Sequence, residues 1–330
     1  MSILVTGGAG YIGSVTVEVL RARGRQVVVL DDFSTGHRGA VPPDVTLVEA
    51  SVGDATVVER TVREHGVTAA LHFAARSQVA ESVEDPGLYY RVNVRGAVGL
   101  ITGLERAGVQ RFIFSSSASV YGSNEQGPLS EESPLAPSNP YGFTKVAVER
   151  MLADFSRAYG WQTIALRYFN AAGATVAHGE DHRPETHLIP LALRAARGEG
   201  GPLEIYGTDY STPDGTCVRD YIHVEDLAEA HVLALEALDA GQAAGIYNLG
   251  NGRGFTVHEV LQAVEAVTGN RVPVRVGERR AGDPPMLVAS AQRARLDLRW
   301  RPHRSELEDI IASAATWMEK HPKGYEEPES

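Results

Sequence analysis

A glycine-rich segment directly after the first apolar run constrains the fold more than any other feature of this 330-residue chain. Ile3–Thr6 has the pattern of a short buried strand, and Gly7-Gly8-Ala9-Gly10-Tyr11-Ile12-Gly13 follows it and opens an amphipathic stretch, Ile12–Ala22. Glycines permit a tight turn and let backbone N–H groups approach a pyrophosphate at a helix N-terminus. The segment therefore predicts a dinucleotide-binding βαβ unit.

Short apolar runs alternate with amphipathic stretches throughout the first half of the chain. Strands that alternate with helices indicate a parallel, doubly wound α/β sheet with right-handed crossovers. The predicted strands are Ile3–Thr6, Gln26–Leu30, Thr46–Glu49, Ala69–Phe73, Arg111–Ser115 and Thr163–Arg167, and the predicted helices are Ile12–Ala22, Val57–Glu64, Val92–Ala107 and Tyr141–Tyr159.

From about residue 171 the pattern becomes less regular. It predicts a loop at His178–Pro184, helices at Ile189–Arg197, Val224–Leu238 and Thr256–Thr268, and strands at Leu203–Tyr206 and Ile246–Leu249. Thr256 is a suitable N-cap, and Gly269 follows the last turn of the same helix. We predict a Rossmann-like dinucleotide-binding domain formed by residues 1–170 plus about 214–250, and a smaller, discontinuous α+β substrate domain formed by about 171–213 plus 251–330.

Composition and charge exclude several classes of protein. The chain is 43% hydrophobic and 22% charged, as is typical of soluble globular proteins, and its net charge of −11 argues against nucleic acid as a partner. Cys217 is the single cysteine, which excludes an internal disulfide and an all-cysteine metal site, and we predict no metal site. We find no charged leader before a long apolar stretch and no apolar run of the ~18 residues that a membrane span needs. We therefore expect a cytoplasmic protein with no membrane partner, and a polar tail after Met318 that frays.

Two acids follow the second predicted strand. Asp31 and Asp32 lie about 20 residues beyond the glycine loop, where a carboxylate is expected to bond the adenosine ribose. A carboxylate at this place repels a 2′-phosphate, so the pair favours NAD over NADP. The alternative is that the two aspartates simply begin a turn before Gly36.

A tyrosine and a lysine four residues apart are the first candidates for catalysis. On a helix, Tyr141 and Lys145 would lie on one face about one turn apart. An ammonium group beside a phenol stabilises the phenolate, so we expect the pKa of Tyr141 to fall below about 10 and the phenol to act as a base. The chain has only three lysines, Lys145, Lys320 and Lys323, which makes a lysine at this position more notable. The alternative is a solvated helix face.

Ser115 ends the fifth predicted strand, and Ser116, Ser117 and Ser119 follow it. The carboxyl ends of strands in a doubly wound sheet face the ligand crevice, so a hydroxyl there can bond a substrate oxygen. The alternative is that these serines only cap turns, and not all of them can be catalytic.

The ordered set of motifs resembles the extended short-chain dehydrogenase/reductase family. Gly7–Gly13, the Ser117 segment and the Tyr141–Lys145 pair carry this resemblance. Further stretches are similar to the nucleotide-sugar 4-epimerases of that family, and together they cover nearly the full length of the chain. These stretches are Leu166–Gly173, His187–Pro190, Ile205–Val224, Tyr247–Gly250 and Arg279–Pro284.

The resemblance implies a tightly held NAD and a UDP-sugar substrate, with UDP-galactose and UDP-glucose interconverted by transient oxidation at C4′. It implies that Tyr141 is the base, that Lys145 lowers its pKa and bonds the nicotinamide ribose, and that Ser117 assists proton movement. The residues implied at the NAD site are Gly7, Gly10, Tyr11, Ile12, Gly13, Asp31, Asp32, Phe33, Ser34, Thr35, Gly36, Ser51, Val52, Phe73, Ala74, Ala75, Ser77, Asn93, Tyr141, Lys145 and Phe169. Those implied at the UDP-sugar site are Ser117, Tyr141, Asn170, His187, Leu188, Leu203, Tyr206, Arg219, Tyr221, Val257, Arg280, Asp283 and Leu287.

Three positions bear on cofactor retention and sugar choice. Ser51 stands where close relatives often carry an aspartate, and we expect Asp54 to cap the following helix instead. Ser77 stands where many relatives have a lysine, beside Arg76. Leu287 matches a gate position where some relatives have tyrosine, so N-acetylated UDP-sugars are also expected as substrates.

Other functions on the same scaffold are less consistent with these residues. A nucleotide-sugar dehydratase carries Asp-Glu directly after the Ser117 position, where this chain has Ala118 and Ser119. A UDP-glucuronate epimerase or decarboxylase needs a cation for the C6 carboxylate; we find no clear candidate, but the epimerase stays open. An NAD-sensing regulator on this scaffold would lose the Tyr141–Lys145 pair. The family also implies a homodimer in which Val92–Ala107 and Tyr141–Tyr159 pair across a two-fold axis; alternatively, these faces pack only on their own sheet.

Overall fold

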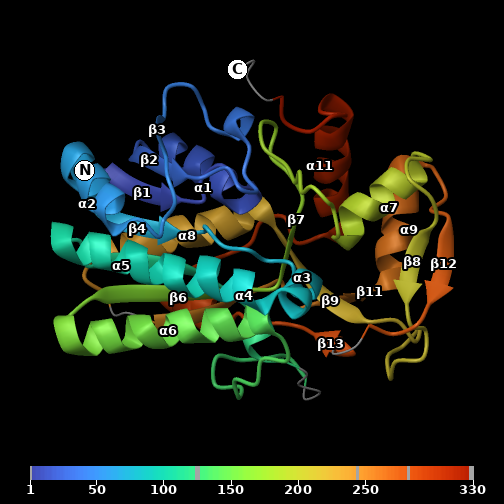
Figure 1. The fold of residues 1–330 in the computed structure, drawn as a ribbon. Coiled ribbons are helices and arrows are strands. Elements are labelled where there is room, and N and C mark those ends of the chain that lie inside the picture. Colours follow the sequence, from blue (N-terminus) through green and yellow to red (C-terminus); the bar gives the residue numbers. More distant parts are fainter. Residues whose placement is uncertain (1, 123–126, 243–244, 281–282, 327–330) are drawn as a thin grey trace.

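The computed structural model describes residues 2–122, 127–242, 245–280 and 283–326 (Figure 1). A seven-stranded parallel sheet organises the molecule, with strand order β10-β6-β5-β4-β1-β2-β3. Its strands are β1 (Ser2–Thr6), β2 (Gln26–Asp31), β3 (Thr46–Glu49), β4 (Val67–His72), β5 (Arg111–Ser117), β6 (Gln162–Tyr168) and β10 (Gly245–Leu249). The predicted doubly wound α/β fold is confirmed, and β10 joins this sheet next to β6.

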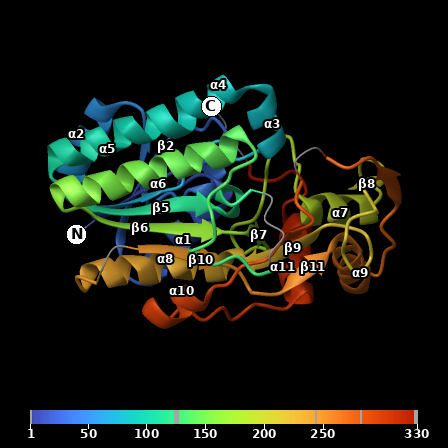
Figure 2. The same cartoon turned by 90° about the horizontal axis from the view of Figure 1, so that it is seen from below.

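Helices cover both faces of the large sheet (Figure 2). The helices on one face are α2 (Ala55–His65), α5 (Gly96–Ala107) and α6 (Pro140–Tyr159), and those on the other are α1 (Tyr11–Ala22) and α8 (Val224–Asp239). Alternate residues of one strand enter the two cores: Leu4 packs on the α5 side, whereas Ile3 and Val5 pack on the α8 side. Because both faces are buried, the strands are continuous apolar runs rather than alternating ones.

The predicted helix at Val92–Ala107 is only partly correct. Tyr90–Arg95 forms a π-helical segment, and α5 begins after it at Gly96. Two short helices, α3 (Val79–Glu84) and α4 (Pro86–Tyr89), precede this segment, and two 3₁₀ turns lie at Arg38–Ala40 and Ala118–Val120. The π-helical segment places Asn93 in the interior, where it takes part in the site described below.

Smaller sheets lie beyond the carboxyl edge of the large sheet. In one of them β9 (Val218–His223) pairs with β7 (Asn170–Ala172), β11 (Gly254–Thr256) and β13 (Met286–Leu287), and in the other β8 (Leu203–Tyr206) pairs with β12 (Val274–Gly277). The accompanying helices are α7 (Leu188–Ala196), α9 (Val257–Thr268), α10 (Gln292–Asp297) and α11 (Leu307–Lys320). Sequence patterns predicted β8 and the helices α7 and α9 but not β7, β9, β11, β12 or β13, most of which are too short to show a clear period.

Helix α9 begins as predicted. The Thr256 hydroxyl accepts from the Glu259 N–H, and the Glu259 carboxylate accepts from the Thr256 N–H, so the two residues form a capping box. The helix ends at Gly269, which has φ +70°. Both ends of this helix are therefore determined by local sequence.

The end of the chain is more ordered than expected. Tyr325 is buried, its Oη accepts from the Gly179 N–H, and its own N–H donates to Asp181 Oδ2. The predicted fraying after Met318 is therefore wrong up to residue 326, and residues 327–330 lie outside the described residues. No helix in the described part of the chain combines the length and hydrophobicity that a membrane span requires.

Candidate active site

The glycine-rich loop between β1 and α1 is shaped by close backbone contacts. Gly7 has φ +72°, and a Cβ at this residue would lie 2.4 Å from the backbone nitrogen of Ala74. A Cβ on Gly13 would lie 2.1 Å from the Gly7 carbonyl oxygen. Among the described residues, no side chain caps α1 at Gly10, and its first turn holds no acid. The loop and the positive end of this helix therefore fit the pyrophosphate of a dinucleotide.

The two predicted ribose acids have different surroundings. Asp31 is buried, and its carboxylate accepts from the Ala9 N–H at 3.0 Å and the Phe33 N–H at 2.9 Å. Burial raises the pKa of Asp31, and the backbone hydrogen bonds oppose that change. Asp32 is exposed and accepts from the Ser34 N–H. Asp31 thus holds the glycine loop against the end of β2, while the carboxylate of Asp32 faces solvent.

The segment after β4 runs beside the glycine loop. The N–H groups of Phe73 and Ala74 both donate to the Thr6 carbonyl oxygen. Asn93 fixes the next residue, because its Oδ1 accepts from the Arg76 N–H at 2.8 Å and its Nδ2 donates to the Arg76 carbonyl at 3.0 Å. These residues meet where the strand order reverses between β1 and β4. Of the other predicted cofactor residues, Val52 and Phe169 are buried, Ile12, Gly36 and Ala75 are partly buried, and Thr35 is exposed.

The two departures from the family pattern have clear local roles. The hydroxyl of Ser51 accepts from the Gly53 N–H, and Asp54 caps α2 as predicted. Ser77 is exposed, and the guanidinium of Arg76 lies 3.8 Å from the Glu81 carboxylate. The guanidinium of Arg76 is therefore directed toward the nearby carboxylate of Glu81.

The structure brings Ser117, Tyr141 and Lys145 together at the carboxyl end of β5. The phenol of Tyr141 is hydrogen-bonded to the Ser117 hydroxyl. One turn along α6, Lys145 Nζ donates to the Ser115 carbonyl at 2.8 Å and lies 5.6 Å from the centre of the Tyr141 ring. Tyr141 is 8% exposed and Lys145 3% exposed, so this face of the helix is not solvated.

We expected Lys145 to lower the pKa of Tyr141. This expectation is wrong when only the side chains and backbone of the protein surround the phenol. Burial raises the pKa of Tyr141, and the hydrogen bond to Ser117 only partly opposes it. Burial also lowers the pKa of Lys145 to about 7, against the opposing charge of Glu149. The lysine is therefore about half neutral near pH 7 and stabilises a phenolate less than a full cation would.

A buried ion pair behind this site was missed by the sequence analysis. Glu149 receives two hydrogen bonds from the Arg167 guanidinium, at 2.6 and 2.9 Å, and a third from the Ser116 hydroxyl. Arg167 also donates to Tyr121 Oη at 3.0 Å. The spacing Tyr141, Lys145, Glu149 along one helix face was the available signal. The pair joins α6 to β5 and β6, and so fixes the helix that carries the candidate base.

Four of the predicted substrate residues form two pairs. Arg219 on β9 donates to Asp283 Oδ1 at 2.8 Å and to the Pro284 carbonyl. The guanidinium of Arg280 lies 3.7 Å from the centre of the Tyr206 ring. Residues 281–282, within the predicted Arg279–Pro284 motif, lie outside the described residues.

The remaining predicted substrate residues lie either on the strands around β9 or in the core between α7 and α9. Asn170 and Tyr221 are register partners in the β7–β9 pair, and Leu287 is the partner of Arg219 in the β13–β9 pair. The side chain of Leu203, by contrast, is buried in the core between α7 and α9. Leu188 and Val257, the first residues of α7 and α9, are partly buried on the same core.

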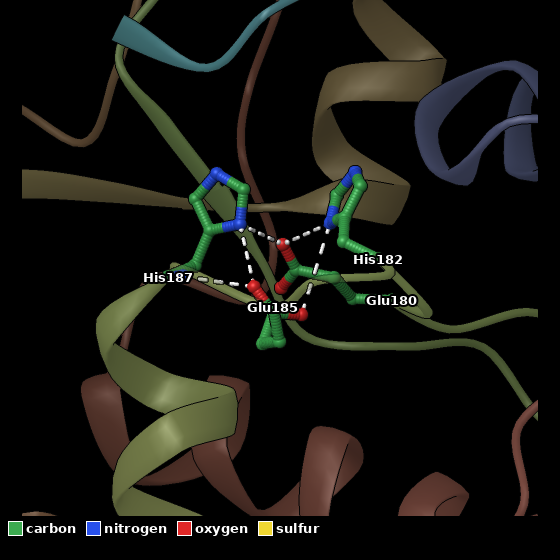
Figure 3. Close-up of side chains that lie close together, drawn as sticks. All are labelled: Glu180, His182, Glu185 and His187. Atoms are coloured by element: carbon green, nitrogen blue, oxygen red, sulfur yellow. Dashed lines mark hydrogen bonds and ion pairs between the residues drawn. The ribbon is translucent and has the colours of Figure 1, made fainter. Parts of the chain in front are cut away.

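His187 does not join the arginines. Its Nδ1 lies 2.8 Å from Glu180 Oε1 and 2.9 Å from Glu185 Oε1 (Figure 3). His182 contacts the same two carboxylates. Burial alone would lower the pKa of His182, but the hydrogen bond to Glu180 and the nearby Glu185 carboxylate raise it to about 9. The sequence pattern predicts only a loop at His178–Pro184, and nothing in it indicates this cluster.

Comparison with known proteins places these features in a family. Residues 3–250 match the model of the NAD dependent epimerase/dehydratase family. The chain is 45% identical to the UDP-glucose 4-epimerase of Lacticaseibacillus casei, over 98% of this chain and 99% of that protein. It superposes on the structure of UDP-glucose 4-epimerase from Brucella ovis in complex with NAD with a TM-score of 0.93 and 46% identity, covering 98% of this chain and 99% of that chain. For the UDP-Glc/GlcNAc 4-epimerase of Campylobacter jejuni the TM-score is 0.84 at 38% identity, covering 97% and 99%. This chain therefore belongs to the NAD dependent epimerase/dehydratase family, and its resemblance to the UDP-glucose 4-epimerases extends over nearly its whole length.

Proposed function

We propose that this chain interconverts UDP-galactose and UDP-glucose by transient oxidation at C4′, with NAD held throughout. The observation that carries the proposal is the buried contact of Tyr141 with Ser117, beside Lys145, at the carboxyl end of β5. It lies in a chain that is 45% identical to a UDP-glucose 4-epimerase over nearly its full length. An alcohol held against this side chain has a base within reach once the phenol is ionised to the phenolate.

The phenol of Tyr141 moves the proton. As the phenolate, Tyr141 takes the proton of the sugar 4′-hydroxyl and becomes the neutral phenol, and it returns that proton to the 4′-oxygen in the reverse step, while Ser117 holds both oxygens in position. Lys145 supplies an adjustable charge, because its pKa of about 7 lets it gain or lose a proton as the phenol changes. NAD, held at the glycine loop that begins at Gly7, would supply the hydride acceptor for oxidation at C4′ and the hydride donor for its reversal. The base and its partners thus serve both directions of the reaction without net redox change.

The substrate has to be held firmly at one end only. Arg219 and Arg280 offer planar guanidinium groups that suit a diphosphate, and the carboxylate of Asp283 suits ribose hydroxyls. The sugar has to turn over between the two hydride transfers, so tight contacts to its ring would prevent inversion. We propose that the elements outside the large sheet, about 171–213 plus 251–330, form the nucleotide-sugar domain, and that residues 1–170 plus about 214–250 hold NAD.

The test needs no added cofactor. Purified protein is mixed with UDP-galactose without NAD, and UDP-glucose is measured by chromatography. The proposal predicts conversion to an equilibrium mixture with no accumulation of free NADH. Lasting absorbance from NADH, or no product from protein that retains NAD, would contradict it. UDP-glucuronate in parallel tests the uronate alternative.

Leu287 supports N-acetylated UDP-sugars as a second class of substrate. It is partly buried beside Phe169 and the Ala118–Tyr121 turn, which directly follows Ser117. A leucine leaves more room beside the sugar 2′ position than a tyrosine does. The rates of UDP-N-acetylglucosamine and UDP-galactose conversion are compared in the native chain and in Leu287→Tyr. A lower rate for the N-acetylated sugar alone in the variant supports this gate. Equal rates for that sugar in the two proteins contradict it.

We also propose that the chain is a cytoplasmic homodimer. Val98 on α5 and Phe143 on α6 are 45% and 51% exposed, and Tyr90 makes an edge contact with Phe143. Figures 1 and 2 show α5 and α6 side by side on the outside of the sheet. Two such faces can pair as a four-helix interface. Light scattering of the native chain and of Phe143→Glu tests this, with a dimer that the glutamate dissociates as the expected result.

A further inference from the structure

The loop between β7 and α7 gathers four side chains with metal-binding atoms. Glu180, His182, Glu185 and His187 each point one such atom toward a common centre, as Figure 3 shows. All four atoms lie within 4.8 Å of one another. Both histidines present Nδ1 to the two carboxylates. Four residues within eight positions of one loop thus converge on one point.

The spacing of these atoms fits a small cation. Ligand atoms 2.0–2.2 Å from a tetrahedral Zn²⁺ stand roughly 3.3–3.6 Å apart. In the cluster, His187 Nδ1 is 2.8 Å from Glu180 Oε1, and His182 Nδ1 is 3.1 Å from the same oxygen. His182 Nδ1 is 3.8 Å from Glu185 Oε2. These three separations lie on either side of the tetrahedral edge, and all four atoms lie within 4.8 Å of one another, so side-chain adjustments of up to about 1 Å bring them to that spacing.

An unpartnered oxygen inside the cluster is a second, independent observation. The side chain of Glu185 is 0% exposed, and its Oε2 has no hydrogen-bond partner among the described residues. A buried carboxylate oxygen without a partner is costly, and a cation would satisfy it. A cavity of about 310 Å³, lined in part by Glu180, His182 and Glu185, gives an ion access to the cluster.

The ligand types limit the choice of cation. Two carboxylates carry two negative charges, and these balance one divalent ion when both imidazoles are neutral. Mg²⁺ and Ca²⁺ prefer oxygen ligands, whereas two imidazole nitrogens with two carboxylates suit Zn²⁺ and neighbouring first-row ions. Each Nδ1 has to release its hydrogen to solvent when the ion binds.

We propose that Glu180, His182, Glu185 and His187 form a binding site for a first-row divalent cation such as Zn²⁺. The ion replaces the direct histidine–carboxylate hydrogen bonds and ties the loop to the first turn of α7. Its ligands all lie in residues 180–187, so its test needs no UDP-sugar, although His187 is also one of the residues that the resemblance implies at the UDP-sugar site.

The experiment uses the full chain after treatment with a chelator and removal of that chelator. Zn²⁺ binding is measured by competition with a chromophoric zinc indicator, without any UDP-sugar. One tight equivalent is expected for the native chain, and a loss of affinity of at least ~100-fold for His182→Gln and Glu185→Gln, because outer-shell changes alone cost 10–100-fold. His65→Gln, at the end of α2, is the matched control and is expected to bind as the native chain does.

A second measurement keeps the test decisive if a variant fails to fold. Co²⁺ is added to the native chain, and its visible absorption is recorded. Strong bands of four-coordinate Co²⁺ that Zn²⁺ abolishes support the site. Weak six-coordinate absorption, or Zn²⁺ affinity that His182→Gln and Glu185→Gln leave unchanged, overturns the proposal. In that case the four residues form a histidine–carboxylate network only.

Discussion

The Tyr141–Lys145 centre and the Glu180–His187 cluster hold their ionisable groups in opposite ways. Lys145 is buried with its cation opposed by desolvation, and its pKa falls to about 7. His182 is buried against two carboxylates that outweigh desolvation, and its pKa rises to about 9. The first centre favours the neutral amine of Lys145, and the second favours the charged imidazolium of His182. Burial therefore does not fix the direction of a pKa shift; the neighbouring charges decide it.

The two regions also differ in how they are built. The candidate catalytic groups lie on α6 and at the end of β5, and Glu149 on α6 joins the two elements through Ser116 while pairing with Arg167 on β6. The cluster lies on a loop, and its members hold one another. Regular elements position groups that are far apart in the sequence, whereas the loop brings near neighbours together.

Removing the phenol should have the largest effect. Tyr141→Phe keeps the ring and its packing but loses the group proposed to carry the proton. Because general-base catalysis contributes typically 10²–10⁴-fold, kcat for UDP-galactose should fall about 10²–10⁴-fold. Turnover is followed by chromatography, and NAD content and melting temperature serve as controls for folding. Full activity of this variant would remove the basis of the proposed mechanism.

Lys145→Met should change how stability depends on pH. The folded pKa of about 7 lies below the ordinary value of about 10.4, so between them the unfolded chain binds more protons. The unfolding free energy of the native chain should therefore rise with pH across this window, by on the order of 4 kcal/mol from this group. Urea unfolding of nucleotide-free protein at pH 6.5 to 10 measures it. A variant that shows the same rise as the native chain would contradict this assignment.

His182→Gln should have the opposite pH dependence. The folded pKa of about 9 lies above the ordinary value of about 6.5, so the folded chain binds more protons between them. The stabilisation is fully present below pH 6.5 and is lost as the pH rises through 9, about 3 kcal/mol in metal-free protein. The difference in unfolding free energy between native chain and variant should thus shrink over this range. A constant difference would show that the carboxylates do not hold this proton.

A methyl group at Gly142 should disturb the catalytic geometry with a smaller effect. A Cβ at this position would lie 2.4 Å from the Ser119 carbonyl oxygen, so α6 has to move away from the turn that follows β5. Misplacement by about 1 Å costs about 10²-fold in rate, and Gly142→Ala should lower kcat by about this factor. Arg150→Ala, at an exposed position in the middle of α6, is the control for helix stability.

The large sheet and the glycine loop could be predicted from the sequence because their signals are local. Buried parallel strands are continuous apolar runs, and Gly7 and Gly13 mark positions where a side chain would collide with backbone. Asp54 and Thr256 are helix caps that can be identified from residue type and spacing. The pairing of Arg219 with Asp283 could not be predicted in this way, because 64 positions separate the two residues.

The sequence by itself determined the fold class, the helix caps and the spacing of Tyr141 and Lys145, since each depends on residues a few positions apart. Only the tertiary structure decided three further features. These are the hydrogen bond from the Ala9 N–H of the glycine loop to Asp31, the direction of the Lys145 ammonium toward the Ser115 carbonyl, and the carboxylates that surround His187. Desolvation and charge pairing are properties of the packed molecule. The pKa values of the buried groups, and with them the direction of each pH effect, therefore follow from packing rather than from residue type.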